Sequence, residues 1–176
     1  MRMVFCGVAA VTLLVAGTQI LSAAAVEHHS LNSGGGKRAY VMNGLIAGPG
    51  LVRIADRLRA RGIVVQMGSY SQASDFAADA CAHRGSHIII VGHSLGATAA
   101  ANMANEVHGC GVRSVTMVSI DPPNIGAAVE GVHAVNFVGA FNGEIGGAHN
   151  ISAPGYGHMD ILESPTMQAR ILSAAQ

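Results

Sequence analysis

The chain alternates between short apolar blocks rich in Val and Ile and longer blocks in which apolar residues recur every three or four positions. The short blocks predict strands at residues 38–45, 63–67, 87–91, 112–120, 132–141 and 148–152. The longer blocks predict helices at residues 47–61, 71–83, 95–109 and 165–174. Because strands and helices alternate over short connections, the sequence predicts an α/β fold, with a mostly parallel central sheet and helices on both faces.

Boundary residues support several of these elements. Pro49 suits the first turn of the helix at 47–61, and Gly62 follows the end of that helix. Ser71 or Ser74 is the expected N-cap of the helix at 71–83. The strand at 112–120 stops before Pro122, because proline has no amide hydrogen for a sheet.

The segment between the third strand and its following helix reads Gly92-His93-Ser94-Leu95-Gly96. This G-x-S-x-G pattern lifts a serine hydroxyl above the sheet on a sharp turn, and its glycines let the strand and the helix approach closely. The N-terminus of the helix directs backbone N–H groups toward a developing oxyanion. Ser94 is therefore the candidate nucleophile, and the competing interpretation is a purely structural turn.

Other chemically capable residues follow the predicted strands. The turn Asn43-Gly44-Leu45 closes the first strand, Ser94 follows the third strand and Asp121 the fourth, and His158 lies in the loop before the last helix. The carboxyl ends of parallel strands meet at one edge of the sheet, where α/β proteins carry their sites. Serine, then acid, then histidine is also the chain order of the α/β-hydrolases.

Residues 38–172 resemble a small serine α/β-hydrolase of the lipase, esterase and thioesterase kind, without a cap domain. The segment at 92–96 resembles the elbow common in lipases and esterases. The segment Ser-Ile-Asp-Pro at 119–122 resembles the one that supplies the acid in pancreatic-type lipases. The segment Gly-His-Met-Asp-Ile at 157–161 is similar to the histidine segment before the last helix in thioesterases and related hydrolases.

The resemblance implies a triad of Ser94, His158 and Asp121, with oxyanion donors in the backbone N–H groups of Leu45 and Leu95. In such a triad the imidazole takes the serine proton, and the carboxylate fixes the imidazole tautomer. Asn43 occupies the position where the family often has histidine. This departure is mild, because the oxyanion donor in that segment is a backbone N–H group and not the side chain. The resemblance thus implies an ester or thioester hydrolase that works through an acyl-enzyme.

Two site assignments have rivals within the sequence. Glu144 follows the fifth strand, where most family members carry the acid, and is the alternative to Asp121. His149 also lies late in the chain and is the alternative base to His158. Asp160, two residues from His158, is too close along the chain for a triad acid, and His93 is expected to pack and position.

Composition narrows the function classes. The 176 residues carry a formal net charge of zero, and only 11% of them are Asp, Glu, Lys or Arg, with no basic cluster. Nucleic acid is therefore not an expected partner. The histidines lack the spacing of metal ligands, so neither a metal nor a cofactor is expected.

A small-molecule ester or acyl compound is the expected partner. Leu45, Ile46, Ile125 and Ile145 lie in the loops expected around the site, and they favour an apolar acyl part. The short chain has no evident lid, which predicts hydrolysis of soluble short-chain esters without interfacial activation. The alternative function is that of a secreted, non-catalytic binding protein with the same fold.

The N-terminal residues predict export. Residues 1–25 combine a basic start, an apolar stretch and an A-x-A ending, which is typical of a signal peptide cleaved after Ala25. Residues 26–37 form a flexible tail, and residues 38–176 form the hydrolase domain. Contact with a membrane is expected only if the first segment is not cleaved.

Two cysteines remain after that cleavage. Cys81 and Cys110 lie near the ends of the helices before and after the central strand, which in a doubly wound sheet end at the same edge. In an oxidising compartment we expect a disulfide between them, remote from the active site. Two unreactive buried thiols are the alternative.

Overall fold

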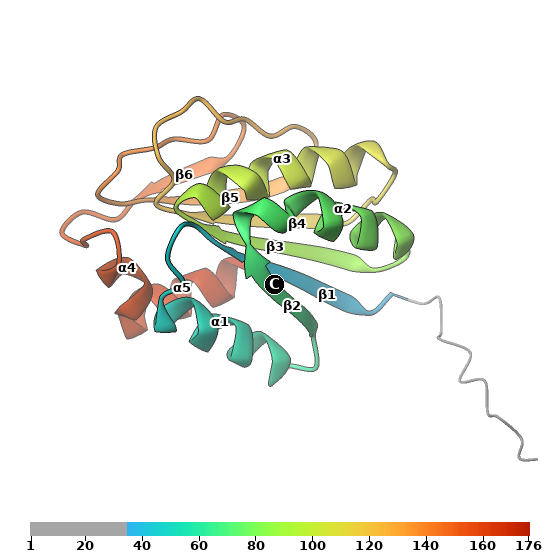
Figure 1. Cartoon of the computed structure of the whole chain (residues 1–176), viewed down its shortest axis with the longest axis horizontal. Coiled ribbons are helices and arrows are strands. Elements are labelled where there is room, and N and C mark those ends of the chain that lie inside the picture. The colour runs from blue at the N-terminus through green and yellow to red at the C-terminus, as the bar shows by residue number, and fades with distance from the viewer. Residues whose placement is uncertain (1–34) are drawn as a thin grey trace, which may run out of the picture. The chain divides into compact units, whose positions relative to one another are not determined.

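The computed structural model describes residues 35–176, which form a single six-stranded sheet covered by helices (Figure 1). The strand order is β2-β1-β3-β4-β5-β6, and every neighbouring pair is parallel. The strands are β1 (Lys37–Asn43), β2 (Val64–Ser69), β3 (His87–His93), β4 (Val115–Ile120), β5 (His133–Val138) and β6 (His149–Ser152). The predicted α/β fold class is confirmed.

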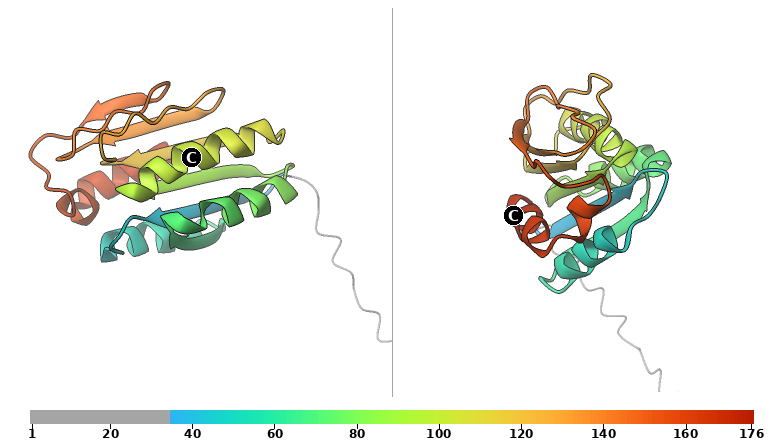
Figure 2. Two further views of the ribbon diagram at one scale, coloured as in Figure 1. Left: turned by 45° about the horizontal axis from the view of Figure 1, so that its top comes forward. Right: turned by 90° about the vertical axis from the view of Figure 1, so that its left-hand side faces the viewer.

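Helices cover both faces of the sheet (Figures 1 and 2). On one face lie α1 (Pro49–Arg59), α4 (Asp160–Glu163) and α5 (Pro165–Ala174), and on the other lie α2 (Ala73–Ala82) and α3 (Leu95–Gly109). Successive strand residues point to opposite faces, so Val41 and Ile89 join the first core, whereas Tyr40 and Ile88 join the second. Burial on both faces explains why the central strands read as uninterrupted apolar runs.

Several boundaries differ from the sequence prediction. The helix predicted at 71–83 is divided into a 3₁₀ turn, η1 (Tyr70–Gln72), and α2. The predicted caps Ser71 and Ser74 are wrong, because Ser69 caps the turn: its side chain accepts the Ser71 N–H, and Gln72 accepts the Ser69 N–H at 3.0 Å. The strands β4 and β5 are shorter than predicted, and the four-residue helix α4 was not predicted at all.

The strand order creates a crevice at the carboxyl edge of the sheet. From β1 the chain passes to β2 on one side of the sheet, whereas from β3 it passes to β4 on the other side. The loops that leave β1 and β3 therefore diverge, which is where ligands bind in open α/β sheets. The loop after β1 contains Leu45, and the turn after β3 contains Ser94.

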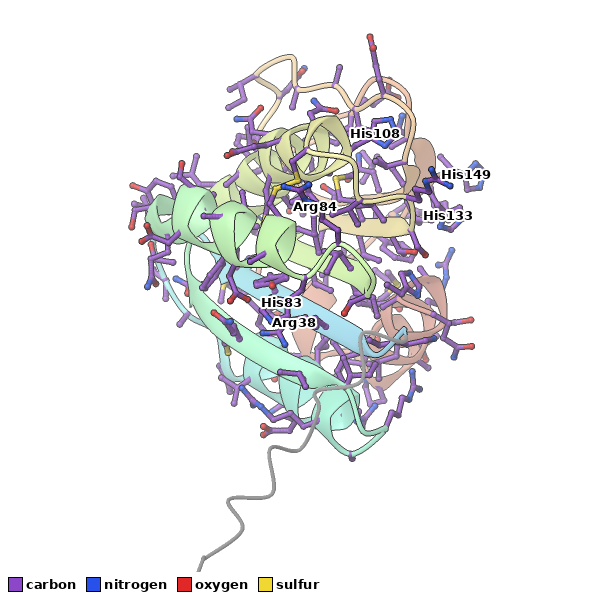
Figure 3. All side chains as sticks on the ribbon, turned by 90° about the vertical axis from the view of Figure 1, so that its right-hand side faces the viewer. Arg38, His83, Arg84, His108, His133 and His149 are labelled. Atoms are coloured by element: carbon purple, nitrogen blue, oxygen red, sulfur yellow. A yellow bond between two sulfur atoms is a disulfide. The ribbon has the colours of Figure 1, made fainter. Side chains whose placement is uncertain are left out.

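A disulfide joins Cys81, in the last turn of α2, to Cys110, which follows α3 (Figure 3). The structure thus contains the predicted bond. Ser94 precedes the first residue of α3, so the disulfide holds the opposite end of the same helix.

Removal of this disulfide is expected to lower stability strongly. The bond joins residues 29 apart, and a closed loop of that size restricts the unfolded chain by about 3 to 4 kcal/mol. The double variant Cys81→Ser, Cys110→Ser should lose that much free energy of unfolding in a urea titration. Wild-type protein titrated with urea in the presence of a reductant should lose a similar amount of free energy of unfolding. An unchanged urea midpoint in both experiments would contradict the expectation.

Within residues 35–176, no helix has the length and apolar character needed to cross a membrane. The predicted signal peptide at 1–25 and most of the predicted tail at 26–37 lie outside the described residues. β1 begins at Lys37, one residue before the predicted start of the domain.

Candidate active site

The turn that carries Ser94 has a constrained backbone. Ser94 has φ 59° and ψ −127°, a backbone conformation that residues other than glycine rarely adopt. A Cβ on Gly92 would collide with the Gly96 carbonyl oxygen, and a Cβ on Gly96 would collide with the Met42 carbonyl oxygen. Both glycines of the motif are thus needed to seat α3 against β1 and β3, which raises Ser94 above the sheet.

Asp121 is fully buried at the end of β4, and its two carboxylate oxygens have separate partners. Oδ1 accepts the backbone N–H groups of Gly139 at 3.1 Å and Phe141 at 2.9 Å. Oδ2 lies 2.7 Å from Nδ1 of His158. The first two bonds fix the carboxylate, and the third engages Nδ1 so that Nε2 remains available on the other side of the imidazole.

The imidazole of His158 is stacked against two aromatic rings. The Phe141 ring centroid lies 3.9 Å from that of His158 at an interplanar angle of 23°, and the His93 centroid lies 4.5 Å away at 28°. Two rings this near and this parallel cannot lie side by side on one face, so they cover opposite faces of the imidazole. This arrangement restricts the ring to one orientation.

His93 also holds the backbone of the His158 loop. Its Nε2 lies 2.9 Å from the His158 carbonyl oxygen. Burial lowers the pKa of His93 below its usual value, so the ring is neutral at pH 7. A carbonyl can only accept, so Nε2 carries the proton, and Nδ1 is buried without a partner among the described residues.

Loss of His93 is therefore expected to disturb the site. His93→Leu removes both the stacking and the N–H donor, and we expect kcat to fall about 100-fold through misplacement of the His158 ring. His93→Gln, whose amide can donate to the same carbonyl, should recover part of the loss. His149→Gln, at an exposed histidine on β6, is the control, and equal kcat in all three variants would contradict this role.

The loop after β1 lies directly against Ser94. A Cβ on Gly44 would be 2.9 Å from Cβ of Ser94 and 3.1 Å from both Oγ of Ser94 and N of Leu95. Among the hydrogen bonds of residues 35–176, none has the N–H of Leu45 or Leu95 as its donor. Both amides therefore lack an acceptor within the described residues, and the Leu95 amide belongs to the turn that carries Ser94.

A cavity of about 330 Å³ opens at these residues, and we call it the Ser94 cavity. Both Ser94 and His158 line it, and so does His93. The remaining lining residues are apolar, namely Leu45, Ile46, Leu95, Pro123, Phe141 and Met159. Leu45 and Ile46 are 78% and 70% exposed, so the mouth of the cavity presents apolar surface to solvent.

Other sequence candidates lie apart from this cavity. The Glu144 side chain is exposed in the loop between β5 and β6, whereas Asp121 is the carboxylate bonded to His158. His149 begins β6 and is exposed (Figure 3). Ile145 is fully buried in the core beside α3, so its prediction as a rim residue is wrong.

Some lining residues were missed in the sequence. Phe141 and Met159 line the cavity. Phe141 was assigned to the end of a predicted strand, and nothing in the sequence around Met159 marks it as a site residue except its neighbour His158. Within the described part of the chain, no group of three or more His, Cys, Asp or Glu side chains is arranged to hold a metal ion.

Solved structures with a similar architecture include TT1662 from Thermus thermophilus, with a TM-score of 0.51 and 14% identity over 80% of this chain and 88% of that one. An acetyl xylan esterase, solved as an iodinated complex, gives a TM-score of 0.51 and 13% identity over 80% of this chain and 96% of its own. The chain has an α/β-hydrolase-type fold. At such identities the likeness extends to the fold alone, and neither a family model nor a curated protein matches the sequence.

Proposed function

We propose that this protein is an exported serine hydrolase that cleaves an ester or thioester through an acyl-enzyme. One observation carries the proposal: Nδ1 of His158 lies 2.7 Å from the buried Asp121 carboxylate, and His158 shares a cavity with Ser94 on a strained strand-to-helix turn. Strain of this kind persists at functional sites, where the surrounding structure maintains it.

In the proposed reaction, Oγ of Ser94 attacks the acyl carbon and its proton passes to Nε2 of His158. Asp121 holds Nδ1 and stabilises the imidazolium that forms. The carbonyl oxygen gains charge near the N–H groups of Leu45 and Leu95, which act as the oxyanion hole. The leaving group takes the proton from Nε2. A water molecule then attacks the acyl carbon and gives a proton to Nε2, and Oγ of Ser94 departs with that proton as the acid is released.

Two further observations support parts of the proposal. One of the structural neighbours is an acetyl xylan esterase, which favours an ester over an amide. A disulfide between Cys81 and Cys110 suits an oxidising compartment, which agrees with export through the predicted signal peptide.

Labelling with a fluorophosphonate probe, followed by peptide mapping, tests the activity class directly. We expect one adduct, on Ser94, that is lost in Ser94→Ala and strongly reduced in His158→Ala. Ser164, a half-buried serine that caps α5, should remain unmodified. A folded protein that takes no adduct would overturn the proposal and favour the non-catalytic binding protein.

A further inference from the structure

One side chain is bonded to the loop that carries the Leu45 amide. Nδ2 of Asn43, the last residue of β1, donates to the Gly44 carbonyl oxygen at 2.7 Å, a short distance for a bond between an amide and a carbonyl. Among the hydrogen bonds of residues 35–176, it is the only one that engages a backbone group of residues 44–47. The orientation of the first peptide unit in this loop therefore depends on the Asn43 side chain.

Gly44 explains why the loop needs such a bond. A Cβ at Gly44 would lie 2.9 Å from Cβ of Ser94, so the close contact with the turn that carries Ser94 requires glycine at this position. Glycine lacks the side chain that restricts backbone rotation, so by itself it would allow the peptide that follows to turn over. The Asn43 amide supplies that restraint from the preceding residue.

The same bond determines the direction of the Leu45 N–H. A planar trans peptide joins the Gly44 carbonyl to the Leu45 N–H, so these two groups point in opposite directions, and fixing one fixes the other. Leu45 lines the Ser94 cavity, whereas Asn43 and Gly44 do not. The Gly44 carbonyl and its Asn43 partner thus lie behind the cavity wall, and the Leu45 N–H faces the other way.

We propose that Asn43 is a positioning residue for the oxyanion hole, which directs the Leu45 N–H toward the oxygen that gains charge in the transition state. This inference rests on the proposed function. Asn43 was expected to matter little because the donor is a backbone group, but its side chain determines where that group points. A misdirected donor costs most where the oxygen carries most charge, so Asn43 should affect kcat and leave KM nearly unchanged.

Asn43→Asp tests this assignment, because a carboxylate has the shape of the amide but cannot donate to a carbonyl. With 4-nitrophenyl butyrate we expect kcat to fall about tenfold or more, toward the roughly 100- to 1,000-fold cost of losing one oxyanion donor, and KM to stay within about threefold. Asn43→Leu removes the donor without adding a charge and should behave alike. Asn102→Asp, at an exposed asparagine of α3, is the matched control and should keep the wild-type kcat.

A tetrahedral adduct shows which of the two amides is affected. Propylboronic acid, which resembles the butyryl group, should shift the amide proton resonances of both Leu45 and Leu95 in isotope-labelled wild-type protein. In Asn43→Asp the Leu95 shift should persist, whereas the Leu45 shift should be lost. A merely structural role for Asn43 would reduce both shifts together.

The inference is overturned if both Asn43 variants lose less than about tenfold in kcat, or if the Leu45 and Leu95 shifts fall together. In either case a wild-type protein that cleaves the ester leaves the proposed function standing. If the wild-type protein neither cleaves the ester nor takes the fluorophosphonate label, the proposed function fails, and the role of Asn43 fails with it.

Discussion

Ser94→Ala is expected to lower kcat about 10⁶-fold for any ester that the wild-type protein cleaves, because without the hydroxyl no acyl-enzyme forms. The Leu45 and Leu95 amides and the apolar cavity remain, so a small residual rate above that of water should persist. Stopped-flow release of 4-nitrophenol from its butyrate ester measures the loss. A variant that keeps a rate within tenfold of wild type would exclude Ser94 as the nucleophile.

Ser94→Gly is the matched control for this experiment. It should be as inactive as Ser94→Ala, but glycine adopts a φ of 59° without the penalty that a Cβ brings. We expect its free energy of unfolding to exceed that of Ser94→Ala by about 1 kcal/mol. The pair therefore separates the loss of chemistry from the strain in the turn.

Asp121→Asn is expected to lower kcat about 10⁴-fold while leaving the fold intact. The amide can present an N–H to Nδ1 of His158, which would place the imidazole proton on Nε2 and prevent that nitrogen from accepting the Ser94 proton. One oxygen remains to accept the N–H groups of Gly139 and Phe141, so the loop after β5 should keep its conformation. Steady-state kinetics, with circular dichroism as the check on folding, measures both effects.

Glu144→Gln is the control for Asp121→Asn, because Glu144 is the rival acid in the sequence. Its side chain is exposed, so we expect kcat to stay within twofold of the wild-type value. The reverse pattern, with a large loss in Glu144→Gln and a small one in Asp121→Asn, would assign the acid to Glu144.

The positions of Ser94 and Asp121 could be predicted because both follow buried parallel strands whose apolar runs are unmistakable in the sequence. Once the sheet is parallel, its carboxyl ends must share an edge, and the loops after β1, β3 and β4 must meet there. Local pattern and topology together thus brought Leu45, Ser94 and Asp121 to one place. His158 was located by its similarity to a known histidine segment.

The surroundings of His158 could not be predicted in the same way. The stacking of Phe141 and His93 on His158 depends on how the loop after β5 and the loop before α4 fold over the end of β3. Ile145 shows the same limit, because its loop turns inward and buries it, whereas an irregular segment ordinarily runs over the surface. Such tertiary placement leaves no periodic pattern in the sequence.

The two rings that enclose His158 also determine how protons can travel in the proposed reaction. Rotation of the imidazole about its Cβ–Cγ bond would require Phe141 and His93 to separate and the Asp121 hydrogen bond to break. While these contacts hold, the ring cannot flip to deliver its proton elsewhere. Nε2 of His158 therefore serves both halves of the cycle. The leaving group departs past Nε2, and the water molecule then arrives from that same side.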